Sequence, residues 1–290
     1  MLPKRLLYAA ALCVPLIAVQ AGAQTASAPA APAAPAAASN ESLVPAVVAA
    51  LTPGAAAMSG PVRNIVLVHG AFVDGSSWNG VIVELQKKGY NVSAVQNPLT
   101  SLADDADAVR QVLSRQTGPT LLVGHSWGGT VITEAGADAP NVVGLVYIAA
   151  IAPDVGESTS DVLKHGPTMP INASIAPDAD GYLWLDPAKY HDDFAADVPE
   201  SQTRVLSAGE QPIAAKAFSD PVTKAAWKSK PSWYMVATKD RAVSPDLEQW
   251  MAKRIGATVI SIPSSHLAPV SHAVEVAVAI DLAAQNLNKP

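Results

Sequence analysis

The sequence predicts an α/β fold in which helices cover both faces of a mostly parallel, doubly wound sheet. Continuous apolar runs of strand length alternate with longer segments of helical periodicity, at the spacing of βαβ units. The strand runs lack the polar alternation of a sheet with one wet face, so both faces must be covered. One run ends at a serine between glycines, directly before a segment compatible with a helix.

Residues 1–23 are predicted to be a signal peptide, which implies export to the periplasm or the medium. Two basic residues precede the apolar run 6–19, and small residues offer a cleavage site after Ala23. A membrane anchor is the alternative, but the run is short for a bilayer, so we expect no stable membrane insertion after signal removal. The only cysteine, Cys13, lies in this segment, which excludes disulfides and thiol nucleophiles from the mature chain.

Residues 24–60 are rich in alanine and proline and are predicted to be a linker, followed by one α/β domain over 61–290. The 290 residues are 49% hydrophobic and 15% charged, which is a globular composition with ample core. The net charge of −6 and the absence of a basic block give no indication of a nucleic-acid partner. Nothing in the sequence indicates an oligomeric state.

The elements of the domain are predicted from the apolar patterns and their glycine and proline breaks. Strands are expected at residues 63–70, 90–96, 120–123, 141–149, 232–237 and 257–262, and helices at 77–88, 102–115, 130–137, 245–255 and 271–286. Ligands of such sheets bind at the carboxyl ends of the strands, so the residues that follow the strands are the candidates for a site.

Between residues 154 and 230 the regular alternation stops, and prolines, acidic residues and aromatics are interleaved. An insertion of this size between two strands is expected to form a small helical cap over the carboxyl edge and to shape a pocket there. We expect Trp227 to pack the cap onto the sheet and Trp184 to contact a ligand. His165 and His191 have no partners at metal-ligand spacing, so no metal is expected.

The serine of the strand-to-helix turn is Ser126, and it fits the pattern Gly-x-Ser-x-Gly with Gly124 and Gly128. A serine on so sharp a turn has a strained backbone, and side chains two residues to either side would collide. The turn exposes the hydroxyl, whereas a glycine-rich turn with an incidental serine is the alternative. The amides of Ala71, in the loop 69–72, and of Trp127 are the expected oxyanion donors, and we expect His69 to be structural.

Asp240 and His266 each follow a strand and therefore lie at the same sheet edge as Ser126. A serine hydroxyl needs a base to take its proton, and that base needs an acid to orient it and stabilise its charge. Asp154 and His272 are the rival acid and base. Asp154 enters a proline and glycine turn, and His272 falls at the start of a helix, so we favour Asp240 and His266.

Four segments, 68–72, 124–129, 238–240 and 265–266, together resemble the α/β-hydrolases of the small esterase and hydroxynitrile-lyase branch, which includes plant methyl esterases and bacterial relatives. The resemblance runs from about residue 64 to the carboxyl terminus. It implies a Ser-Asp-His triad in that order, an oxyanion hole from the two amides named above, and no metal or cofactor.

Within this branch, lyases typically carry a threonine just before the oxyanion residue and a lysine just after the catalytic histidine, where this chain has Gly70 and Leu267. Neither side chain can stabilise cyanide, so the resemblance favours hydrolysis of small-molecule carboxylic esters through an acyl-enzyme. Phe72, Leu267 and Trp184 are the expected substrate contacts. A catalytically silent ligand-binding protein, and a lactonase or cofactor-free haloperoxidase, remain as alternatives.

Overall fold

The structure is a computed structural model that describes residues 61–289. The predicted signal peptide, 1–23, and the predicted linker, 24–60, lie outside the described residues, so both stay predictions. Within 61–289, no helix is long and apolar enough to cross a membrane.

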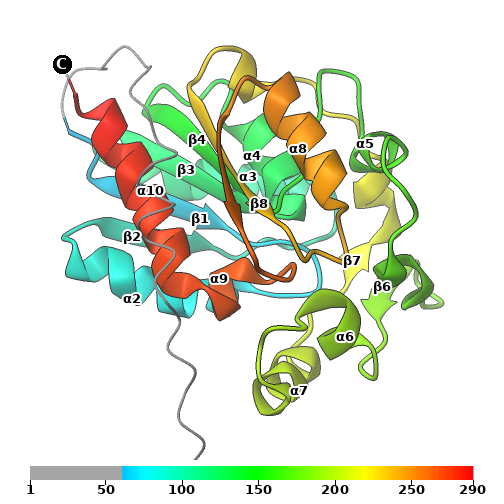
Figure 1. The fold of residues 1–290 in the computed structure, drawn as a ribbon. Coiled ribbons are helices and arrows are strands. Elements are labelled where there is room, and N and C mark those ends of the chain that lie inside the picture. Colours follow the sequence, from blue (N-terminus) through cyan, green and yellow to red (C-terminus); the bar gives the residue numbers. More distant parts are fainter. Residues whose placement is uncertain (1–60, 290) are drawn as a thin grey trace, which may run out of the picture. The chain divides into compact units, whose positions relative to one another are not determined.

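Six strands form one sheet in the order β2-β1-β3-β4-β8-β9, and every neighbouring pair is parallel (Figure 1). The strands are β1 (Asn64–Val68), β2 (Asn91–Val95), β3 (Thr120–His125), β4 (Val142–Ile148), β8 (Ser232–Ala237) and β9 (Thr258–Ile262). The predicted fold class is confirmed, and each strand falls within a few residues of its expected place.

Helices cover both faces of this sheet. They are η1 (Gly75–Trp78), α2 (Asn79–Lys87), α3 (Leu102–Ser114), α4 (Trp127–Ala135), α8 (Pro245–Arg254), α9 (Ala268–Ser271) and α10 (Ala273–Leu287). Two expectations need correction: the helix expected at 77–88 begins as a 3₁₀ turn, and the helix expected at 271–286 is two helices separated at His272.

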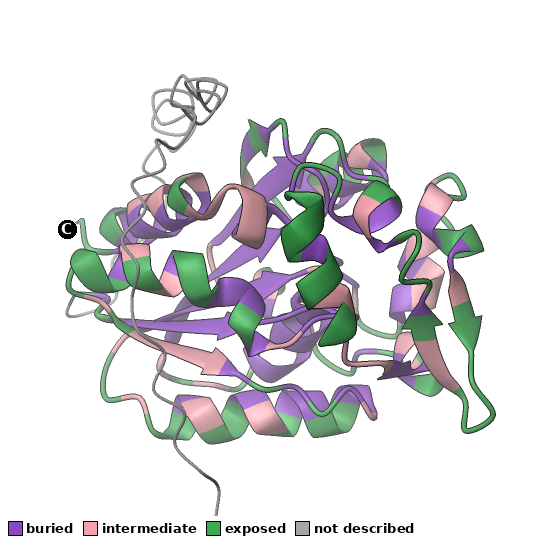
Figure 2. Ribbon diagram, turned by 90° about the horizontal axis from the view of Figure 1, so that it is seen from below, coloured by how far each residue is buried: buried purple, intermediate pink, exposed green. Residues whose placement is uncertain are grey.

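The central strands are buried on both sides (Figure 2). The side chains of successive residues point to opposite faces and pack into two different hydrophobic cores. Ile65 and Leu67 of β1 pack with α2 and α10, whereas Val66 and Val68 pack with α3, α4 and the cap. This double burial explains why the strands are continuous apolar runs in the sequence.

The chain between β4 and β8 forms the cap. Its elements are α5 (Thr159–Leu163), η2 (Pro170–Ala173), β5 (Ile175–Pro177), β6 (Tyr182–Leu185), α6 (Tyr190–Phe194), α7 (Glu200–Ala208), β7 (Ile213–Ala214), η3 (Ala215–Ser219) and η4 (Ala226–Lys228). The cap was expected to be helical, but β5, β6 and β7 also form a small antiparallel sheet. These strands are too short and too exposed to leave a strand pattern in the sequence.

Candidate active site

Ser126 lies at the junction of β3 and α4, with φ 54° and ψ −122°. The glycines around it are a steric requirement. A Cβ at Gly124 would lie 2.5 Å from the carbonyl oxygen of Gly128, and a Cβ at Gly128 would lie 2.4 Å from that of Val68. Both approaches are far closer than van der Waals contact, so backbone atoms on two sides fix the strained turn.

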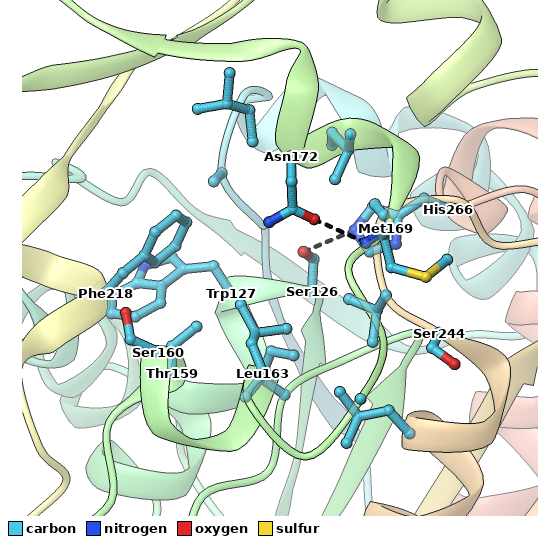
Figure 3. A pocket seen from close by; sticks show the side chains of 18 of the residues that line it. Ser126, Trp127, Thr159, Ser160, Leu163, Met169, Asn172, Phe218, Ser244 and His266 are labelled. Atoms are coloured by element: carbon cyan, nitrogen blue, oxygen red, sulfur yellow. Dashed lines mark hydrogen bonds between the residues drawn. The ribbon is translucent and has the colours of Figure 1, made fainter.

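The structure brings Ser126, His266 and Asp240 together (Figure 3 shows the first two). The Nε2 atom of His266 is 2.8 Å from Ser126 Oγ, and its Nδ1 atom is 2.5 Å from Asp240 Oδ2. The other carboxylate oxygen, Oδ1, accepts from the main-chain N–H groups of Ala242 at 2.6 Å and Val243 at 2.8 Å. The carboxylate of Asp240 accepts a hydrogen bond from Nδ1–H, which leaves Nε2 to accept the serine proton.

The rival acid and base lie elsewhere. Asp154 forms an ion pair with Lys228 at 2.5 Å. The His272 ring contacts Ser271 Oγ at 2.9 Å and Asp197 at 3.5 Å. Position therefore favours Asp240 and His266.

Ala71 and Trp127, the expected oxyanion residues, line one cavity together with Ser126. Trp127 is the first residue of α4, where the N–H groups have no partner within the helix. Its indole Nε1 donates to Asp105 Oδ2 at 2.7 Å, and Asp105 Oδ1 accepts from the N–H of Leu99 at 2.7 Å. Burial raises the pKa of Asp105 to about 6. Asp105 thus fixes the indole ring of Trp127.

His69 braces the loop that carries Ala71. Its Nε2 accepts from the N–H of Asn97 at 2.9 Å, so its Nδ1 donates to the carbonyl of Gly70 at 2.8 Å. Burial lowers the pKa of His69, which agrees with this neutral tautomer. These contacts favour the structural role expected for it.

Sequence reasoning missed His125, which is fully buried beside the nucleophile. Burial lowers its pKa well below the usual range, so the ring is neutral, and its Nε2 donates to the main-chain carbonyl of His266 at 2.9 Å. The residue before the serine thereby holds the backbone of the base. It occupies a variable position of the Gly-x-Ser-x-Gly pattern, so the pattern itself gave no signal.

Glu248 of α8 was also missed. It is fully buried, and its Oε2 accepts from the N–H of Ala237 at 3.0 Å. Burial raises its pKa well above the usual range, and the neighbouring Asp240 carboxylate raises it further. Its Oε1 accepts from no N–H or O–H donor among the described residues, and burial favours the protonated acid, whose hydroxyl can donate to the carboxylate of Asp240. An acid in the first turn of a helix is common, so the sequence gave no signal.

A cavity of about 570 Å³ opens at Ser126 and His266, with walls that are mostly apolar. Phe72 lines it, whereas Leu267 and Trp184 do not, and the three substrate contacts stay predictions. Leu267 is buried in the core. Trp184 is 43% exposed and donates to Asp178 at 2.8 Å. Its neighbour Leu183 lines the cavity instead, because successive strand residues face opposite sides.

One polar side chain faces Ser126 from the cap (Figure 3). Asn172 Oδ1 accepts from the N–H of Met169 at 3.1 Å, which leaves its amide NH₂ free toward the cavity. Sequence reasoning did not single out Asn172. Among residues 61–289, no group of three His, Cys, Asp or Glu side chains is placed to hold a metal ion.

Residues 65–279 match the model of the alpha/beta hydrolase family. An alpha/beta hydrolase of Aspergillus novofumigatus is 30% identical over 211 residues, which cover 66% of this chain and 83% of that protein. A carbendazim hydrolyzing esterase of Nocardioides sp. is 31% identical over 125 residues, 39% of this chain and 52% of the esterase. Among solved structures, a pyrethroid hydrolase from Sphingobium faniae has a TM-score of 0.68 at 24% identity, covering 77% of this chain and 98% of its own. The chain therefore belongs to the alpha/beta hydrolase family.

Proposed function

We propose that this protein is a serine esterase that cleaves small-molecule carboxylic esters through an acyl-enzyme. The observation that carries the proposal is the hydrogen-bonded series Ser126, His266 and Asp240 at the mouth of the cavity, at 2.8 Å and 2.5 Å. The related proteins that are named hydrolases and esterases support the same class of reaction.

In the proposed mechanism, Ser126, His266 and Asp240 act in both acylation and deacylation. His266 Nε2 takes the proton of Ser126 as its Oγ attacks the ester carbonyl, and Asp240 stabilises the imidazolium that forms. The N–H groups of Ala71 and Trp127 stabilise the oxyanion. The alcohol leaves with the proton from His266, and water activated by the same ring then hydrolyses the acyl-enzyme.

The cavity supports esters with one bulky apolar group. Its volume of about 570 Å³ fits a small-molecule ligand, and its walls, which include Phe72, Leu163 and Phe218, are mostly apolar. The amide of Asn172 is a hydrogen-bond donor for an acceptor oxygen on such a substrate.

The surroundings of Gly70 and Leu267 disfavour cyanohydrin cleavage. A Cβ at Gly70 would lie 2.7 Å from the Cβ of Ser126, so a threonine does not fit there without displacing the nucleophile. Leu267 is fully buried outside the cavity, so its side chain does not reach a leaving group.

The proposal is tested with a fluorophosphonate probe and with p-nitrophenyl acetate and butyrate. We expect one covalent adduct, on Ser126 by peptide mass spectrometry, and turnover of both esters. Ser126→Ala should lose the adduct and at least about 10⁴-fold in kcat while it keeps the wild-type circular dichroism spectrum. A wild-type protein with neither adduct nor turnover would overturn the proposal and favour a ligand-binding role.

We also propose that the enzyme is exported. The predicted signal peptide over residues 1–23 supports this. Amino-terminal sequencing of protein from the periplasm or the medium should begin at Gln24, whereas intact Met1 on intracellular protein would contradict export.

A further inference from the structure

One short segment of the cap, residues 190–197, contacts the three loops that carry Ala71, Asp240 and His266. The hydroxyl of Tyr190 donates to the carbonyl of Phe72 at 3.2 Å, next to Ala71 in the oxyanion loop. Asp193 forms an ion pair at 2.9 Å with Arg241, next to Asp240.

Asp197 makes the third connection, to the loop of the base. It accepts from the main-chain N–H of Ser265 at 2.9 Å and from the Ser265 hydroxyl, directly before His266. The ring of His272 lies 3.5 Å from the same carboxylate. Ala71, Asp240 and His266 thus each have a directly adjacent residue that is tied to this segment.

The centre of the segment packs on the base itself. The ring centroid of Phe194 lies 5.1 Å from that of His266 and 5.1 Å from that of Tyr190, and it lies 6.2 Å from that of Phe72. Phe194 also lines the cavity. The same few residues therefore form part of the substrate wall and support the imidazole from behind.

The carboxylates of Asp193 and Asp197 are each held by several polar partners. Asp193 is only 9% exposed along its side chain, and its second oxygen accepts from Ser174 at 2.8 Å. Burial raises the pKa of Asp197, but the hydrogen bonds from Ser265 and the charge of His272 outweigh it, so the pKa lies below the usual value. Both groups are ionised at neutral pH, and their partners are charged or polar groups of the catalytic loops.

We propose that residues 190–197 position the catalytic loops. The packing of the cap on the sheet and the alignment of Ser126, His266 and Asp240 then occur together. The proposal rests on the esterase function proposed above. It makes Asp193, Asp197 and Tyr190 positioning residues, which act through Arg241, Ser265 and Phe72.

A misaligned base slows the chemical step for every substrate, because a displacement of 1 Å can cost about 100-fold in rate. A damaged pocket wall, by contrast, affects mainly the bulky substrates that touch it. Hydrolysis of p-nitrophenyl acetate, whose acyl group is small, therefore separates positioning from pocket shape.

The test compares Asp197→Asn and Asp193→Asn with Glu157→Gln as a matched control. Glu157 pairs with Arg254 at 2.9 Å and 3.0 Å, and it ties the cap to α8 without touching a catalytic loop. Its side chain is 29% exposed, against 22% for Asp197 and 9% for Asp193. We expect each Asp variant to lower kcat for p-nitrophenyl acetate and the rate constant of fluorophosphonate labelling by about 10- to 100-fold. The control should stay within about twofold, since it changes no catalytic loop.

Unchanged kcat and labelling rates in both Asp variants would overturn the proposal, as would a loss confined to bulky esters. If the Asp variants do not fold, Tyr190→Phe and Ser265→Ala each remove one hydroxyl, and the same rates decide. The Asp197→Asn and Ser265→Ala changes should also be non-additive. A wild-type protein without turnover or labelling refutes the esterase itself, whereas an active wild type with unaffected variants refutes only the positioning role.

Discussion

Carboxyl groups support the candidate site from two sides, and the directions of their pKa shifts are opposite. Behind the site, burial raises the pKa values of Asp105 and Glu248, which accept mainly from uncharged N–H groups. In the cap, Asp193 and Asp197 have lowered pKa values, because ion-pair and hydroxyl partners outweigh their burial. On the sheet side, Asp105 and Glu248 are thus held without oppositely charged partners. On the cap side, Asp193 and Asp197 are ionised and depend on their charged or hydroxyl partners.

A second difference concerns what fixes the backbone. At Ser126 the main chain itself leaves no space, since a Cβ at Gly128 would meet Val68 at 2.4 Å. In the cap, side-chain contacts carry the connection, as between Asp193 and Arg241. The sheet edge therefore sets the chemistry by rigid geometry, and the cap is the part that can change without rebuilding the nucleophile.

The largest expected effect tests which carboxylate, that of Asp240 or that of Asp154, acts on His266. Asp240→Asn should lower kcat for p-nitrophenyl acetate by about 10⁴-fold, because an amide stabilises the wrong tautomer of His266. Asp154→Asn should stay within about twofold, because Asp154 pairs only with the partly exposed Lys228. A larger loss from Asp154→Asn than from Asp240→Asn would transfer the role to Asp154.

The next effect contrasts two glycines. Gly128→Ala should lower the free energy of unfolding by about 3 kcal/mol or more and abolish turnover, because its Cβ has no space beside Val68. Gly156→Ala in the cap meets no atom within 4 Å and has φ 84°, so it should cost only about 1–2 kcal/mol. Chemical denaturation measures both, and equal costs would refute the steric account of the turn.

A smaller effect concerns the support of Trp127. Asp105→Asn leaves either the indole N–H or the N–H of Leu99 facing an amide NH₂, so it should cost about 1–3 kcal/mol of unfolding free energy. Asp107→Asn on the exposed side of α3 is the control, since it removes only a surface pair with Arg110, worth about 0.5 kcal/mol. Equal stability of the two variants would show that Asp105 is dispensable.

A further effect separates the two carboxyl classes by pH. Glu248 keeps its proton in the folded protein where the unfolded chain has lost it, so folding is penalised by about 1.4 kcal/mol per pH unit above its unfolded pKa, up to its folded pKa. Glu248→Gln removes that penalty, and its stability relative to wild type should rise between pH 5 and pH 8.

Asp197→Asn supplies the opposite sign. Because the folded pKa of Asp197 is lowered, its contribution to stability is complete above the unfolded pKa and is lost only as the pH falls through the folded value. The stability difference from wild type should therefore be present at neutral pH and vanish in acid. Denaturant melts across pH check both, and parallel curves for the two variants would contradict the distinction.

The sheet and the nucleophile turn could be predicted because local sequence determines them. Double burial makes each central strand an apolar run, and the crowding around Ser126 demands Gly124 and Gly128. Asp240 and His266 were placed at the same edge by the parallel topology, and they are in hydrogen-bond contact.

The remaining features depend on tertiary contacts that no local pattern records. His125 acts through the main-chain carbonyl of His266, which is distant in sequence, and Glu248 acts on the carboxylate of Asp240, in the loop before α8. The position of Trp184 outside the cavity was not foreseen because β6 was not recognised as a strand, and the side to which Trp184 points depends on the strand periodicity.

The cap leaves the sheet after β4 and returns at β8, and these two strands are hydrogen-bonded neighbours, with Ile148 opposite Met235. An insertion whose two ends lie close together can be replaced as a unit without interrupting the sheet. A chimera that receives a cap from another member of the family would gain a new acyl or alcohol pocket in one step. The transplanted cap would need carboxylates at the positions of Asp193 and Asp197, so that it contacts the catalytic loops as the native cap does.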